Sequence, residues 1–118
     1  MPMKNPQELA VRILEDWNSH DLDSIMSHYS DSFTITSPMI QSRLGIDDGT
    51  LKGKQNVRAW WDRVLKKVPD LTFTLRDTAI GADGTLLVMY HSSHNDKTIA
   101  SAFTLDDRGL ISREVYYN

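Results

Sequence analysis

The second half of the chain consists of segments in which apolar and polar residues alternate, separated by short turn sequences. Four such segments cover residues 71–80, 85–94, 97–105 and 110–117. Glycine, asparagine and aspartate dominate the connections 81–84, 95–96 and 106–109, and these residues favour tight turns. A period of two is typical of strands with one buried face. The pattern therefore predicts four consecutive strands paired as an antiparallel meander.

The lengths of the turns predict which side chains meet across these strands. A two-residue turn at 95–96 places Tyr90 opposite Ser101, and a four-residue turn at 106–109 places Ser101 opposite Glu114. The same face carries mostly apolar residues: Leu86, Val88, Ile99, Phe103, Leu105, Leu110 and Tyr116. We assign this face to the interior, so that three polar groups meet within an apolar surface. A register slip of one residue would reverse the assignment.

The opposite face of the predicted sheet is smaller and more polar. Its residues are Leu87, Met89, His91, Ala100, Ala102, Thr104, Arg113 and Val115. We expect this outer face to form the interface of a homodimer.

The first half of the chain predicts three helices. Asn5 can cap the first, Pro6 suits its first position, and its apolar stripe is Leu9, Ala10, Ile13, Leu14 and Trp17. Asp21 can cap a short second helix, with Leu22, Ile25, Met26 and Tyr29 on one side. The third spans 54–67 and presents Val57, Trp60, Trp61, Val64 and Leu65 on its apolar side. We interpret the three tryptophans mainly as core, with Trp17 placed to form the wall of a pocket.

The region between the second and third helices predicts one strand and a long loop. Residues 33–36 alternate with period two, and the strand ends before Pro38. Residues 39–52, which include Gly45 and Gly49, are interpreted as a loop of the length typical of lids and pocket rims. Helices followed by a curled antiparallel sheet make an α+β fold, which we expect to span residues 1–118 as one domain.

Composition excludes several classes of function. The formal net charge of −3 gives no broad electrostatic reason to bind nucleic acid or an anionic membrane. With no cysteine there are no disulfides, thiolate metal sites or cysteine nucleophiles, which fits a reducing compartment. The first residues lack the apolar core of a signal peptide, and the longest apolar run, 86–90, is too short to span a bilayer. We therefore expect a cytoplasmic protein.

Three stretches resemble the nuclear transport factor 2-like superfamily, which includes SnoaL-like polyketide cyclases and ketosteroid isomerases. The stretch 17–38 is similar to the opening of that superfamily, 53–61 to its glycine-led helix, and 105–111 to its final hairpin turn. The resemblance implies a cystatin-like fold, a cone of curved antiparallel sheet packed against three N-terminal helices around one pocket. It also implies dimerisation through the outer sheet face.

The resemblance does not carry over the catalytic set of the ketosteroid isomerases. Ser37 stands where those enzymes have the aspartate base, while Ile13 and Ser101 stand where they have the two oxyanion donors. Of two supporting tyrosines, Tyr29 is kept and Trp61 replaces the other. Without the base and both donors, proton abstraction of that type is not expected.

The polyketide cyclases use a carboxylate in the late strands, sometimes with a histidine, and Glu114 is the nearest counterpart here. A glutamate that faces an apolar cavity should have a raised pKa, because burial disfavours its charged form. We take Glu114, Tyr90 and His94 as the catalytic candidates, without a cofactor. The remaining ligand-binding candidates are Ile13, Trp17, Tyr29, Ser37, Trp61, Ser101, Phe103 and Tyr116.

The catalytic candidates also have purely structural explanations. Glu114 can be hydrated at the open end of the cone, or paired with Arg58 or Arg63, and His94 can be an exposed histidine beside a turn. We see no metal site, because no pair of histidines or cluster of carboxylates has ligand spacing. The sequence leaves three functions open: an acid/base enzyme of the cyclase or isomerase type, a non-catalytic protein that binds a small, mostly apolar organic molecule, and an assembly domain with a filled cone.

Overall fold

The computed structural model of the protein describes residues 6–117, so the predicted cap at Asn5 lies outside the described residues. Within this range helices and strands follow in the order α1 (Pro6–Ser19), α2 (Leu22–Met26), β1 (Tyr29–Thr36), α3 (Pro38–Leu44), β2 (Thr50–Lys52), α4 (Lys54–Lys67), β3 (Phe73–Ile80), β4 (Leu86–Ser92), β5 (Lys97–Leu105) and β6 (Ile111–Tyr117).

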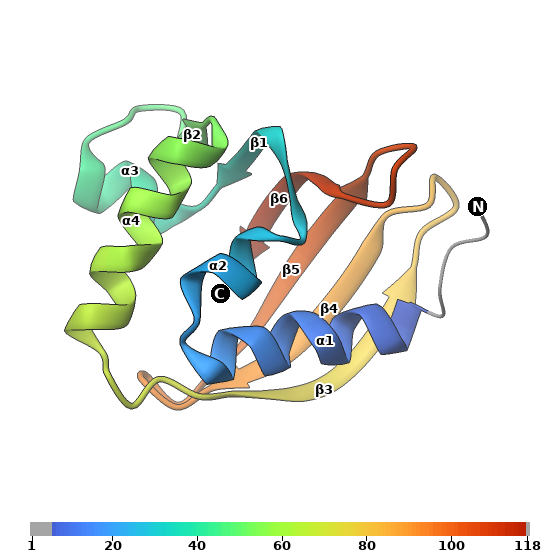
Figure 1. Ribbon diagram of the computed structural model, residues 1–118, viewed down its shortest axis with the longest axis horizontal. Helices are drawn as coiled ribbons and strands as arrows, with labels where there is room; N and C mark the ends of the chain where they lie inside the picture. The colour runs from blue at the N-terminus through green and yellow to red at the C-terminus, as the bar shows by residue number, and fades with distance from the viewer. Residues whose placement is uncertain (1–5, 118) are drawn as a thin grey trace.

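One curved, open sheet holds these strands in the order β2-β1-β6-β5-β4-β3 (Figure 1). The predicted meander is confirmed, because β3, β4, β5 and β6 pair antiparallel in sequence. The first strand, β1, pairs parallel to β6 and antiparallel to β2. The predicted α+β fold class is therefore confirmed.

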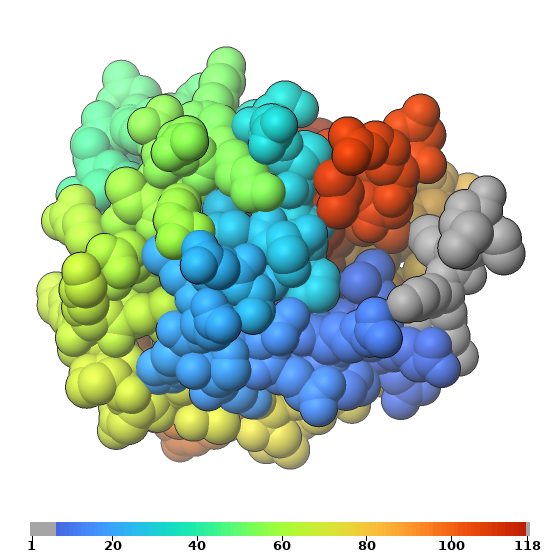
Figure 2. Space-filling model, in the orientation of Figure 1, coloured from blue at the N-terminus to red at the C-terminus, as the bar shows by residue number. Residues whose placement is uncertain are grey.

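The helices pack on one face of this sheet. Figure 1 shows α1, α2 and α4 on the near face, and in Figure 2 their side chains close over it so that the sheet emerges mainly at its edges. The inner face of the sheet and the apolar stripes of α1 and α4 form one core, in which Ala10, Ile13 and Val57 are at most 2% exposed. On the outer face Met89 remains 38% exposed.

The beginning of β1 corrects the prediction for Tyr29. The short helix α2 is capped by Asp21, whose carboxylate accepts the backbone N–H groups of Asp23 and Ser24. It ends at Met26 with Ser27 as its C-cap, and Tyr29 is already the first residue of β1 instead of a member of the helix. Tyr29 is nevertheless buried, because it packs against Phe33 with ring centroids 4.5 Å apart.

The expected loop over residues 39–52 is wrong, since this stretch contains both α3 and β2. The side chain of Ser37 accepts the N–H of Met39 at 3.2 Å, Pro38 occupies the first turn of the helix, and Gly45 ends it with φ of 70°. These are the ordinary start and stop signals of a helix. The fold thus has a fourth helix where three were predicted. Two of the four helices, α3 and α4, follow the first strand β1 in the chain.

The connection between β4 and β5 is longer than predicted. Ser92 pairs with Lys97, so the turn consists of the four residues 93–96 instead of Asn95 and Asp96 alone. Each residue of β4 therefore pairs two positions away from the expected partner, and Tyr90 lies opposite Ile99. Because two residues are one full period of a strand, every side chain keeps its predicted face.

A register shift between Thr104 and Leu105 changes the pairing of β5 with β6 in the same way. Leu105 pairs with Ile111, and Phe103, instead of Ser101, pairs with Glu114. Asp106 accepts the backbone N–H groups of residues 108 and 110 within the preceding turn. Ile111 becomes fully buried in place of the predicted Leu110, which is only half-buried, while Glu114 stays on the inner face.

Candidate functional site

A cavity of about 500 Å³ opens between the helices and the inner face of the sheet. This volume falls in the range of pockets that hold small organic ligands. Trp17 of α1, Trp61 of α4 and Phe73 of β3 contribute its aromatic wall. Glu114 and Tyr116 of β6 contribute the sheet side, and His94 lies in the turn after β4.

The aromatic wall is a connected cluster of rings packed edge to face. The ring centroids of Trp17 and Trp61 lie 4.9 Å apart at 73°, and those of Trp17 and Phe73 lie 5.7 Å apart at 68°. Tyr29 packs against Trp61 at 5.0 Å from the core side. Such contacts fix the planes of the rings, so the wall is a rigid surface against which a flat apolar molecule can pack.

Glu114 is the buried acid of this cavity, and it is 5% exposed. The hydroxyl of Ser101 donates to Glu114 Oε2 at 2.9 Å, and the hydroxyls of Tyr90 and Ser101 are 2.8 Å apart. Because Ser101 has one hydroxyl proton and gives it to Glu114, Tyr90 donates to Ser101. Glu114 Oε1 is buried and has no hydrogen-bond partner among the described residues. One carboxyl oxygen is thus held by a hydrogen bond within the protein, while the other is buried without a partner among the described residues.

Burial controls the ionisation of this group. It raises the pKa of Glu114 from 4.5 to about 7, and the hydrogen bond from Ser101 limits the rise. Burial, and then the charge of Glu114, raise the pKa of Tyr90 well above 10 and that of Tyr116 to about 12. Near neutral pH the carboxyl group therefore exists in both protonation states, while the two tyrosines remain neutral donors.

The predicted meeting of Tyr90, Ser101 and Glu114 does occur, although none of them directly opposes another in the ladder. The three lie on diagonal positions of β4, β5 and β6. Diagonal neighbours on one face are still within reach of long side chains. Of the three residues only Glu114 lines the cavity. Ser101 contacts Glu114 on the side away from the cavity, and Tyr90 contacts Ser101.

The other candidate residues occupy different places. Trp17, Trp61, His94 and Tyr116 line the cavity together with Glu114. Four candidates lie outside its lining and are at most 3% exposed: Ile13, Tyr29, Ser37 and Phe103. Ser37 serves as the N-cap of α3, and the other three are members of the core.

The structure also shows whether Glu114 pairs with an arginine and whether His94 is exposed. Arg58 pairs with Asp23 at 2.7 Å, and Glu114 forms no ion pair with any described residue. His94 is an exposed turn residue that also lines the cavity. His91 points to the other face and contacts Asp96 at 2.6 Å.

Several lining residues escaped sequence reasoning. Met39 and Arg43 belong to α3, where the sequence pattern predicts a loop, and Ser92 lies at the end of β4 before the longer turn 93–96. The cap signals around Ser37 could have revealed α3. Lys67 also lines the cavity, and no sequence signal distinguishes it from Lys66, which does not.

No group of three or more histidine, aspartate or glutamate side chains within residues 6–117 is arranged to hold a metal ion. Among the described helices none has the length and apolar character needed to cross a membrane.

Solved structures similar to this chain share its fold. A SnoaL-like protein of unknown function from Burkholderia thailandensis is 30% identical, with a TM-score of 0.92 over 99% of this chain and 98% of that chain. A Mycobacterium tuberculosis protein in complex with estradiol-17β-hemisuccinate is 21% identical, with a TM-score of 0.72 over 98% and 95%. TerC, co-crystallised with polyporic acid, is 16% identical, with a TM-score of 0.72 over 97% and 92%. A search of curated proteins gives no match.

The fold and the sequence assign the chain to a family. The helices packed on one face of an open, curved sheet form a fold that the chain shares with a solved protein described as nuclear transport factor 2-like. The sequence profile of the SnoaL-like domain matches residues 10–113. The protein belongs to the SnoaL-like family.

Proposed function

We propose that the protein binds a small, flat, mostly apolar organic molecule in the cavity, and that Glu114 exchanges a proton with it in a cofactor-free reaction of the cyclase or isomerase type. The observation that carries this proposal is Glu114 Oε1, a buried carboxyl oxygen without a partner among the described residues, on a side chain that lines an aromatic cavity. A buried polar atom left unpaired is costly, so a ligand atom that pairs with it gains affinity.

The protonation of Glu114 suits both directions of proton transfer. With a pKa near 7, the carboxylate can accept a proton from a carbon next to a carbonyl, and the acid can return it to another atom of the same molecule. Ser101 holds Oε2, so that Oε1 is the atom that exchanges the proton. Tyr90 orients Ser101, and His94 at the rim contacts the outer part of the ligand.

Two features support ligand binding over an assembly role. An assembly domain needs a filled interior, whereas the cavity has about 500 Å³. Two proteins of the same fold were crystallised with small organic molecules. Binding without catalysis is the second candidate, because the aromatic wall alone is sufficient for it.

We include two further expectations in the proposal. The outer sheet face, on which Met89 is 38% exposed, forms a homodimer interface. Light scattering should give the mass of a dimer for the wild-type protein and of a monomer for Met89→Glu. The absence of cysteine also supports a reducing, cytoplasmic location.

Fluorene and 9-fluorenone provide a matched test of binding, because they share flat rings and differ in one carbonyl group. Quenching of the tryptophans in the cavity wall reports occupancy. We expect fluorenone to bind more tightly than fluorene at pH 5.5, where Glu114 donates to the carbonyl oxygen, and to lose this advantage at pH 8.5. In Glu114→Gln the amide donates at both pH values, so the advantage should no longer depend on pH.

Deuterium exchange into 2-tetralone, followed by NMR in D2O, separates the enzyme from the binding protein. The wild type should accelerate exchange next to the carbonyl, and Glu114→Gln should lose about 10²-fold or more of that rate while it still binds fluorenone. Equal exchange in both proteins would contradict the catalytic role of Glu114. Binding of fluorenone without accelerated exchange in the wild type would favour the non-catalytic function.

A further inference from the structure

We propose that the ligand of the cavity is an organic anion, with a flat apolar body inside and its anionic group held at the mouth by Arg43 and Lys67. This inference rests on the ligand-binding function proposed above and adds the chemical class of the ligand.

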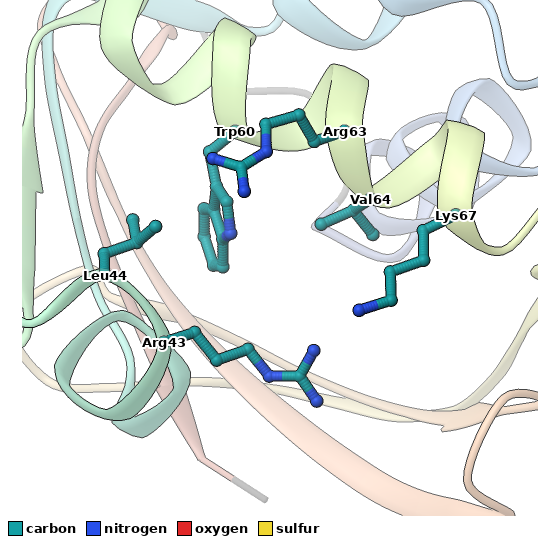
Figure 3. A pocket seen from close by; sticks show the side chains of 6 residues that line it. All are labelled: Arg43, Leu44, Trp60, Arg63, Val64 and Lys67. Atoms are coloured by element: carbon teal, nitrogen blue, oxygen red, sulfur yellow. The ribbon is translucent and has the colours of Figure 1, made fainter.

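A second hollow of about 360 Å³ adjoins the cavity between α3 and α4. The two share Arg43, Trp60, Val64 and Lys67 as lining residues, so these side chains lie where the cavity meets the outer hollow. Arg63 lines the outer hollow only. Figure 3 shows the charged ends of Arg43, Arg63 and Lys67 extending into this space around the indole ring of Trp60.

These three cations have no acidic partner among the described residues. Neighbouring cations do: Lys66 contacts Asp62 at 2.9 Å, and Arg58 contacts Asp23 at 2.7 Å. The chain as a whole carries a formal charge of −3, so three unpaired cations around one hollow run against its overall charge. Like charges held close together repel each other, and an anion between them relieves that repulsion.

The two ends of the cavity fix the orientation of such a ligand. The interior presents apolar side chains such as Trp17, Leu71 and Phe73, which accept a flat ring system but no charge. Glu114 is negative when ionised and repels an anion from the sheet side. The anionic group therefore remains at the mouth, while a neutral polar atom of the ligand reaches Glu114 Oε1.

A pair of fluorescent probes tests this arrangement directly. 1-Anilinonaphthalene-8-sulfonate and N-phenyl-1-naphthylamine share their ring system, and only the first has an anionic group. We expect the sulfonate to bind the wild type more tightly, and its advantage to decrease between 20 and 500 mM salt. The double variant Arg43→Gln, Lys67→Gln should weaken sulfonate binding about fivefold, in keeping with two partly exposed charge pairs, and should weaken binding of the amine much less.

Lys66→Gln is the matched control, because Lys66 neighbours Lys67 on α4 but pairs with Asp62 and lines neither hollow. It should leave both affinities unchanged. Equal wild-type affinity for the two probes, or equal weakening of the sulfonate in Lys66→Gln and in the double variant, would overturn the anion proposal. Binding of the neutral amine would still support the ligand-binding function, and failure to bind either probe would contradict both proposals.

Competition identifies the anionic group. If 2-naphthoate displaces the sulfonate probe at a lower concentration than 2-naphthyl phosphate does, the result would support a carboxylate ligand. If 2-naphthyl phosphate needs the lower concentration, the result would support a phosphate. Displacement by neutral methyl 2-naphthoate at the same concentration as either anion would overturn the proposal.

Discussion

The inner face of the sheet has two halves of opposite character. The first half is formed by Leu86, Val88, Phe103 and Ile111, which are apolar and belong to the buried core. The second half is formed by Tyr90, Ser92, Ser101 and Glu114 of the same strands, and it lies beside a cavity. The border between the halves runs diagonally across the sheet, because Ser101 pairs with Val88 and Glu114 pairs with Phe103. We call these the filled half and the cavity half. The comparison indicates that the first half contributes to the apolar core, while the second contains a buried acid with one oxygen that has no partner among the described residues.

The filled half should show the largest loss of stability. Phe103 is 3% exposed and lies directly opposite both Leu86 and Glu114 in the sheet. Phe103→Ala removes a buried ring and leaves a void, which should lower the free energy of unfolding by about 3–5 kcal/mol in urea titrations. Phe103→Leu should lose much less. A loss below 1 kcal/mol for the alanine variant would mean that this half is not well packed.

In the cavity half, Glu114→Gln should increase stability at alkaline pH. Between pH 4.5 and 7 the folded chain keeps a proton on Glu114 that the unfolded chain has lost, so this group stabilises the fold below pH 4.5 and loses its contribution as pH rises through 7. The shift corresponds to about 3 kcal/mol. Urea titrations should therefore find the variant more stable than the wild type by up to about 3 kcal/mol at pH 8.5, and similar to it near pH 4.5. A difference that is independent of pH would contradict the assignment.

Ser101→Ala should have a smaller effect of the opposite sign. It removes the donor to Glu114 Oε2 and leaves the hydroxyl of Tyr90 without its partner, which should lower the free energy of unfolding by about 1–3 kcal/mol at pH 8.5. Because the Ser101 hydrogen bond lowers the pKa of Glu114, its loss should move the pH-dependent step to higher pH. Ser101→Thr keeps the hydroxyl group and should keep the position of the step. A serine-to-alanine variant with an unchanged step would show that Ser101 does not hold the carboxyl group.

Tyr90→Phe should produce the smallest change. Ser101 still donates to Glu114 in this variant and loses only the hydrogen bond that it accepts, so we expect a loss of about 1 kcal/mol in thermal or urea unfolding. The affinity for fluorenone should change less than in Glu114→Gln. An effect as large as that of Ser101→Ala would place Tyr90, instead of Ser101, at the centre of the network.

The two halves also differ in how far sequence predicts them. The facing of Leu86, Ser101 and Glu114 follows from a period of two, because at these residues the errors in the predicted registers were shifts of two, which preserve the face. The polar network was predictable for this reason. Next to the turn 106–109 the error is one residue, and there Ile111 replaces Leu110 on the inner face. The cross-strand partner of each residue was not predictable, because it depends on turn length and on the register shift near Thr104. The sequence has no strong signal for that shift.

The mouth of the cavity was not predicted for a different reason. Arg43 and Lys67 are distant in sequence, and they meet only because α3 packs near α4. The helix α3 itself is predictable from the signals at Ser37, Pro38 and Gly45, although the glycines in this stretch also favour a loop. The parallel pairing of β1 with β6, and the volume left unfilled beside Glu114, depend on the whole packed structure.

The ionisation of Glu114 tests the central claim most directly. The chain contains three glutamates, Glu8, Glu15 and Glu114, so selective 13C labelling of the side-chain carboxyl groups gives few signals to follow with pH by NMR. We predict one signal with a midpoint near pH 7 that is absent from Glu114→Gln. A midpoint near 4.5 for the signal lost in that variant would contradict a buried acid prepared for proton exchange.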